Sequence, residues 1–77
     1  MQEIENQIKT IVADVIDVNV AEVTKESAIG DFPAWDSMGQ LVILQRVEET
    51  YCIKFEPEEM MEIEDVNDII KTVEAKL

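Results

Sequence analysis

One serine stands where its side chain could take part in chemistry. Ser37 lies in the stretch Trp35-Asp36-Ser37-Met38, at the expected start of a helix, where exposed N–H groups and the helix dipole favour an attached phosphate. The chain has no histidine, so the general base that most often activates a serine is missing. We therefore interpret Ser37 as a residue that another enzyme modifies. The alternative is that Asp36 and Ser37 only cap the helix.

The remaining reactive side chains are few. Cys52 is the one cysteine, which excludes an internal disulfide and a thiolate metal cage, and we expect it to be a small, partly buried apolar residue. The acidic run after Phe55 lacks the spacing and the glycine of a calcium loop, so the sequence predicts no metal site. We expect this run to be a solvated face or, alternatively, a surface that receives Lys and Arg side chains of partners. Its members are Glu56, Glu58, Glu59, Glu62, Glu64 and Asp65.

The charge balance restricts the partners. The chain has 18 Asp and Glu against 6 Lys and Arg, a net charge of −12 at pH 7. Binding to nucleic acid or to an anionic membrane is therefore not expected, whereas a basic protein surface is. No apolar run approaches the ~18 residues of a membrane span, and the start of the chain does not read as a secretory signal, so we expect a cytoplasmic protein. With 77 residues, one domain over residues 1–77 and a monomer are expected.

Apolar spacing predicts helices and no strand. A first helix is expected over residues 2–17, a second from Asp36 or Ser37 to about residue 51, a short third helix from Pro57, and a last helix from near Asp65 to the end. The expected fold is an all-α four-helix bundle, with three longer helices, one short third helix, and a long loop between helices one and two.

The long loop, over residues 18–35, loses the helical period. A connection of this length usually has a function or contains a short helical turn. We expect Trp35 to anchor it, because an exposed indole would leave a large apolar area in water; the alternative is that Trp35 forms a lid near Ser37. Four further apolar residues are expected to attach the loop to the core: Val20, Val23, Ile29 and Phe32.

The second expected helix has two faces, because successive residues turn by about 100°. The core face contains Gln40, Leu41, Ile43, Leu44, Val47 and Tyr51. A face directed away from the core contains Met38, Val42, Gln45 and Glu49. Met38 and Val42 would then form an apolar patch for a partner, close to Ser37. The alternative is that both pack under Phe32, Trp35 or the short third helix.

These features together resemble the acyl carrier protein and peptidyl carrier protein family. Asp36-Ser37-Met38 opens the second helix, Glu48-Glu49 lies near its end, and residues 53–57 lead into a short acidic helix, so the resemblance covers essentially the whole chain. It implies that Ser37 carries a 4′-phosphopantetheine arm attached by a phosphopantetheinyl transferase. The thiol of that arm would hold an acyl, polyketide or aminoacyl group as a thioester. It also implies that Asp36 supports recognition by the transferase and its magnesium.

The same resemblance implies a role and partners. A discrete, stand-alone carrier is not an enzyme; it presents its cargo to acyl- or aminoacyl-loading and transferring enzymes with basic docking surfaces. The residues expected to contact them are Met38, Val42, Glu48 and Glu49. The alternative function is an acidic helical interaction module that is never modified and occupies a basic partner surface.

Two departures from fatty-acid carriers affect the expected pathway. Gly39 and Val42 stand where those carriers usually have acidic residues, and Trp35 before Asp36-Ser37 is more similar to carriers of specialised pathways. We therefore expect partner recognition that is more apolar, and a specialised pathway rather than primary fatty-acid synthesis.

Overall fold

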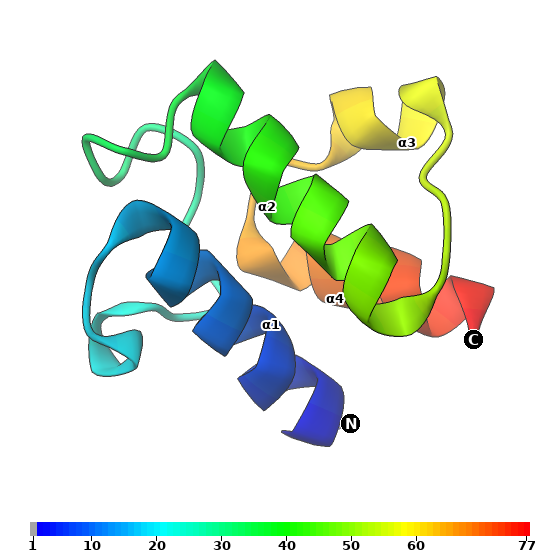
Figure 1. The fold of residues 1–77 in the computed structure, drawn as a ribbon, viewed down its shortest axis with the longest axis horizontal. Coiled ribbons are helices and arrows are strands. Elements are labelled where there is room, and N and C mark those ends of the chain that lie inside the picture. Colours follow the sequence, from blue (N-terminus) through cyan, green and yellow to red (C-terminus); the bar gives the residue numbers. More distant parts are fainter. Residues whose placement is uncertain (1) are drawn as a thin grey trace.

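The protein folds into four α-helices, as the computed structural model shows for residues 2–77 (Figure 1). They are α1 (Gln2–Ile16), α2 (Ser37–Tyr51), α3 (Pro57–Glu62) and α4 (Val66–Lys76), and a single 3-10 turn, η1 (Val20–Glu22), lies in the long loop. Within residues 2–77 the only β pairing is an isolated bridge between Ala28 and Asp65. The all-α fold with three longer helices and a short third one is confirmed; Met1, part of the expected domain range, lies outside the described residues.

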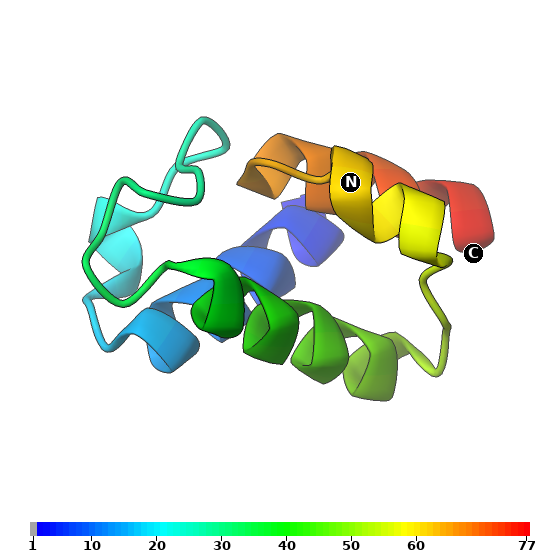
Figure 2. The same ribbon diagram turned by 90° about the horizontal axis from the view of Figure 1, so that it is seen from above.

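The helices pack in two layers with the long loop at one end (Figures 1 and 2). α1 and α2 run antiparallel beside each other, α4 lies in the other layer, and the short α3 lies on the side of α2 that faces away from α1 in Figure 1. The start of α2 therefore lies beside the long loop, at the end of the molecule away from the C-terminus. Among residues 2–77, no helix is both long and apolar enough to cross a membrane.

The helix ends form where capping residues predict them. The Asp36 carboxylate accepts a 2.9 Å hydrogen bond from the Gly39 N–H, so Asp36 is the N-cap of α2. Asp65 caps α4 in the same way through the Asp68 N–H, at 2.8 Å. The Asp68 carboxylate accepts from the N–H of Glu64, one residue earlier than a capping box requires. The boundaries of α2 and α4 thus follow from local side-chain chemistry.

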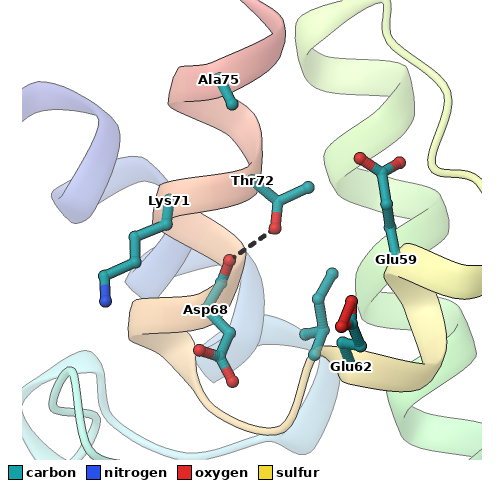
Figure 3. A pocket seen from close by; sticks show the side chains of 7 residues that line it. Glu59, Glu62, Asp68, Lys71, Thr72 and Ala75 are labelled. Carbon is teal, nitrogen blue, oxygen red and sulfur yellow. Dashed lines mark hydrogen bonds between the residues drawn. The ribbon is translucent and has the colours of Figure 1, made fainter.

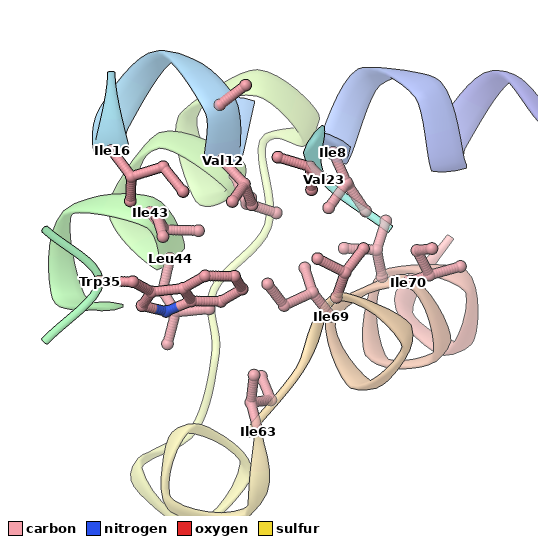
Figure 4. Close-up of a cluster of buried hydrophobic side chains, with 14 of the residues drawn as sticks. Ile8, Val12, Ile16, Val23, Trp35, Ile43, Leu44, Ile63, Ile69 and Ile70 are labelled. Atoms are coloured by element: carbon pink, nitrogen blue, oxygen red, sulfur yellow. The ribbon is translucent and has the colours of Figure 1, made fainter. Parts of the chain in front are cut away.

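The core is one apolar cluster with members from α1, α2, α4 and the connecting segments (Figure 4). α3 has no buried residue of its own. The largest member of the cluster is Trp35, with no exposed surface, so the predicted anchoring role of this residue is confirmed. α2 contributes a narrow stripe of Gln40, Ile43, Leu44 and Val47. Leu41 was expected on this face, but that is wrong: it is 59% exposed, because the buried arc of α2 is narrower than the predicted one.

Backbone hydrogen bonds also hold the long loop in place. The Ile29 N–H donates to the Glu64 carbonyl (3.1 Å), and the Val66 N–H donates to the Ser27 carbonyl (3.0 Å), which fixes the loop to the link between α3 and α4. Val23 is buried and Phe32 packs against the core, as expected. Val20 and Ile29 are exposed, so for them the expected core contact is wrong. The backbone bond of Ile29 holds its segment in place without a core contact of its side chain.

Cys52 also differs from expectation. It is exposed and forms the C-cap of α2 in the left-handed conformation, with φ 56°. In this conformation the chain turns away from the helix, so the side chain leaves the line of the buried stripe. The expectation of a partly buried Cys52 is therefore wrong.

Candidate functional site

Ser37 is the first residue of α2, and its side chain is exposed. Its neighbour Asp36 is also exposed and uses its carboxylate to cap the helix. The N–H groups of a first helical turn have no partner within the helix, and together with the helix dipole they favour a negatively charged group at this end. The hydroxyl of Ser37 is therefore accessible to another protein and lies where a phosphate would be stabilised.

A buried polar bridge holds this helix start in place. The indole N–H of Trp35 donates to Oε1 of Gln40 at 2.7 Å, and Nε2 of Gln40 donates to the Ile63 carbonyl at 3.0 Å. We call these three residues the Trp35–Gln40–Ile63 bridge. It connects the loop before Ser37, the first turn of α2 and the end of α3. Within residues 2–77, no buried side-chain N or O atom is left without a partner, so the bridge satisfies its own polar groups.

The backbone around Trp35 is fixed as well. Its N–H donates to the Phe32 carbonyl (3.0 Å), and its carbonyl accepts from the Gly30 N–H (2.8 Å). Gly30 has φ +94°, a conformation that glycine adopts without strain. Ser37 follows Trp35 by two residues. Its exposed side chain therefore projects from a segment that is held by backbone hydrogen bonds and by the buried Trp35 side chain.

Gly39 allows the loop to lie against the first turn of α2. A Cβ atom at this position would lie 2.2 Å from the Ala34 carbonyl oxygen, far inside contact distance. Sequence reasoning noticed Gly39 only as the absence of an acidic side chain. Its steric role depends on the loop path, which residue types alone do not reveal.

Gly39→Ala is expected to lower the free energy of unfolding by about 1–3 kcal/mol, since the backbone must shift to admit the methyl group. This strain exceeds the roughly 1 kcal/mol by which alanine normally favours a helix over glycine. Urea denaturation of both proteins measures the difference. Gln45→Ala, at an exposed position of the same helix, is the matched control and should stay within about 0.5 kcal/mol. A Gly39→Ala protein as stable as the wild type would show that the loop does not rest on α2.

An exposed apolar surface begins next to Ser37. Met38 is 76% exposed, Leu41 59% and Val42 44%, and we call these three residues the α2 apolar face. Ser37 and Leu41 are four residues apart and are therefore neighbours on the helix surface. The prediction that Met38 and Val42 point away from the core is confirmed, and the alternative, packing under the loop or α3, is wrong. Leu41, assigned to the core from the sequence, belongs to this face.

The two glutamates near the end of α2 have different surroundings. The Glu48 carboxylate accepts a 2.7 Å hydrogen bond from the Phe55 N–H, so this side chain holds the chain that leads to α3. Glu49 is exposed. Both line an open hollow of about 510 Å³, together with Gln45, Cys52, Ile53 and Lys54. The turn after α2 thus uses the carboxylate of Glu48 and not that of Glu49.

Part of the acidic run takes part in the fold, and Figure 3 shows two of its members, Glu59 and Glu62, at a hollow lined by residues of α3 and α4. The Glu59 carboxylate accepts from the Glu56 N–H (2.7 Å) and pairs with Lys76 of α4 (2.8 Å), and the Lys76 ammonium lowers the pKa of Glu59. Glu58 and Glu62 are exposed. Glu59 and Glu62 line a hollow of about 490 Å³ between α3 and α4. No group of three or more potential metal-binding side chains occurs in residues 2–77.

Known proteins and a family model match this chain over nearly its whole length. A family model described as "Phosphopantetheine attachment site" matches residues 6–73. The acyl carrier protein of Porphyromonas gingivalis is 26% identical over 77 residues, which cover 100% of this chain and 99% of that protein. The acyl carrier proteins of Thermotoga maritima and Coprothermobacter proteolyticus are each 26% identical over 76 residues, covering 99% of this chain and 94% and 93% of theirs.

Proposed function

The chain belongs to the acyl carrier protein family with its phosphopantetheine attachment site, and from this membership we propose that Ser37 is the residue that carries the arm. The exposed hydroxyl on the first residue of α2 is the observation that supports this assignment. The surroundings fit the group, because the phosphodiester would lie at a helix N-terminus that favours negative charge. The arm supplies a thiol, which holds the cargo as a thioester.

The roles of this chain's own residues follow from their contacts. Ser37 offers an accessible oxygen, and Asp36 holds the first turn of α2 through the Gly39 N–H. Trp35 and Gln40 keep that turn in a fixed place from the inside. Without histidine, the chain has no evident base to activate Ser37 itself. We infer that it acts as a carrier and that a phosphopantetheinyl transferase catalyses the attachment.

Intact-mass spectrometry tests the proposal. The protein is incubated with coenzyme A, magnesium and a transferase of broad specificity, beside a carrier known to be modified. A single phosphopantetheine adduct, located by fragmentation on the peptide that contains Ser37, is the expected result. No adduct under conditions that modify the control carrier would overturn the proposal and favour an unmodified acidic interaction module.

Asp36 has two separable roles, in the helix cap and in transferase recognition. Asp36→Asn keeps a good N-cap, whereas Asp36→Ala removes it at a cost of about 1 kcal/mol. We expect both variants to be loaded more slowly, because both remove the charge that supports the transferase and its magnesium. Thermal unfolding should distinguish them, with only the alanine variant destabilised. If Asp36→Asn is loaded at the wild-type rate, Asp36 serves only as a cap.

We further propose that the α2 apolar face is the surface that partner enzymes contact beside the arm, with Glu49 at its acidic edge. A small apolar centre with charged surroundings suits transient docking, and the net charge of −12 favours partners with basic surfaces. Glu48 is a weaker candidate, because its carboxylate is bound to Phe55. The apolar Val42 and the small Gly39 support a specialised pathway rather than primary fatty-acid synthesis.

Met38→Glu and Val42→Glu are each expected to reduce turnover by a partner enzyme about tenfold, as for a buried residue at an interface centre. Circular dichroism should show unchanged helicity, since both side chains are largely exposed. Thr10→Glu adds the same charge at an exposed position on α1 and controls for charge alone. Equal turnover by all three variants and the wild type would place the docking surface elsewhere.

A further inference from the structure

Gln40 is the one polar side chain among the four buried residues of α2. It is 8% exposed, and both polar atoms of its amide have partners: Oε1 accepts from the Trp35 indole, and Nε2 donates to the Ile63 carbonyl. A buried hydrogen bond adds only a small net stability, because the same groups bond to water in the unfolded chain. A fully satisfied buried amide instead holds its neighbours in one arrangement. The amide of Gln40 therefore determines geometry more than stability.

The two partners of this amide belong to different parts of the fold. Trp35 precedes Ser37 by two residues, at the end of the long loop, and Ile63 is the C-cap of α3. Both are members of the buried cluster (Figure 4). One planar amide holds both partners, at 2.7 Å and 3.0 Å, so a movement of the loop end relative to the end of α3 breaks one of the two bonds. The position of the backbone at Ser37 is thus tied to the end of α3.

Two further hydrogen bonds of this helix start are local. The Asp36 side chain accepts from the Gly39 N–H (2.9 Å), and the Asp36 carbonyl accepts from the Gln40 N–H (2.8 Å). These bonds shape the first turn of α2, but by themselves they do not fix where that turn lies in the molecule. The bond from Gln40 to Ile63 spans 23 positions of the chain. It therefore supplies a placement that local capping does not.

We propose that Gln40 is a positioning residue for attachment of the arm: by holding Trp35 and Ile63, it fixes where the Ser37 hydroxyl stands, so that a transferase meets a single arrangement of the site. This inference rests on the proposed attachment at Ser37. When the bridge is broken, the start of α2 occupies several positions, and the fraction of molecules in the competent one falls. The apparent affinity for a partner falls by the same factor. The transferase then needs more protein to be saturated, while the bound complex reacts at its usual rate.

Gln40→Met tests this role, because methionine is unbranched and apolar and fills about the same space without either hydrogen bond. Loading is followed by mass at saturating coenzyme A over a range of protein concentrations, and circular dichroism verifies the fold. We expect the KM for the carrier to rise about fivefold, the factor equivalent to one net hydrogen bond, with kcat unchanged. Val47→Ala is the matched control. It creates a cavity in the same buried stripe but leaves the bridge intact, so it should be less stable and keep the wild-type KM.

The tryptophan signal gives a readout that needs neither the transferase nor the arm. Trp35 is the only tryptophan, so the NMR spectrum contains one indole N–H signal. In the wild type this proton is buried and hydrogen-bonded, and it should exchange slowly with solvent. Gln40→Met should accelerate the exchange several-fold through local opening and should displace the Ser37 amide signal. Val47→Ala should leave the Ser37 signal in place.

Trp35→Phe breaks the same bridge at its other hydrogen bond, since it keeps an aromatic ring and removes the indole N–H. It should raise the KM as Gln40→Met does, and it takes the place of that variant if the methionine protein does not fold. The double variant should show no further rise in KM, because a bridge that is already broken cannot be broken again. Additive rises would assign the two effects to separate losses of packing and contradict positioning.

Failure of attachment and failure of positioning give different results. No adduct on the wild type overturns attachment at Ser37, and positioning with it. A loaded wild type and a folded Gln40→Met protein with the same KM overturn positioning alone, and so does a rise in KM of equal size in Val47→Ala. A rise confined to the bridge variants, with unchanged kcat and a displaced Ser37 signal, supports the proposal.

Discussion

Trp35→Ala is expected to lower the free energy of unfolding by about 3–5 kcal/mol, the usual cost of removing a large buried aromatic side chain. Trp35 has no exposed surface and is the largest fully buried residue, so its loss leaves a cavity at the centre of the cluster. The change also leaves Oε1 of Gln40 without its indole donor. Small domains have marginal stability, so the loss is a large fraction of the total.

Urea denaturation followed by circular dichroism measures this effect. Trp35→Phe is the informative control, because it keeps most of the apolar volume and removes the N–H. It should cost about 1–3 kcal/mol, from the unsatisfied amide and a smaller ring. Equal losses for the two substitutions would assign the stability to the hydrogen bond alone. Stability unchanged in Trp35→Ala would contradict the central place of this residue in the core.

Local patterns in the sequence were sufficient to predict most of the fold. The apolar residues of α1 and α4 repeat with the helical period, and Asp36, Pro57 and Asp65 mark helix starts through chemistry that involves only the next few residues. The exposed position of the proposed attachment residue could be predicted for the same reason. Asp36 and Ser37 form the start of α2 by local capping, so the exposure of Ser37 could be expected without knowledge of distant contacts.

The features that sequence reasoning missed depend on residues far apart in the chain. Gln40 was correctly placed on the core face, but its partner Ile63 is 23 residues away and no periodicity identifies it. The steric demand on Gly39 comes from the path of the loop at Ala34. Leu41 was assigned to the core because helical periodicity does not fix the width of the buried face. That width depends on how closely the neighbouring helices approach.

Ser37, the proposed attachment residue, has low structural importance. Its side chain is exposed, and the helix cap that precedes it is made by Asp36, so the fold does not require its hydroxyl. A residue of this kind can be replaced without confusing loss of function with loss of structure. The two serines of the chain contrast in this respect, because Ser27 is 6% exposed and its Oγ accepts from the Thr24 N–H at 2.9 Å.

Ser37→Ala is therefore expected to abolish loading completely and to change the free energy of unfolding by no more than about 0.5 kcal/mol. Loading is measured as the mass increase with coenzyme A and the transferase, and stability by urea denaturation. Ser27→Ala should behave in the opposite way, since it loses a partly buried hydrogen bond worth about 1 kcal/mol but is still loaded. An adduct on the Ser37→Ala protein would move the attachment site to another side chain. A strong loss of stability in that variant would show instead that the hydroxyl is part of the fold.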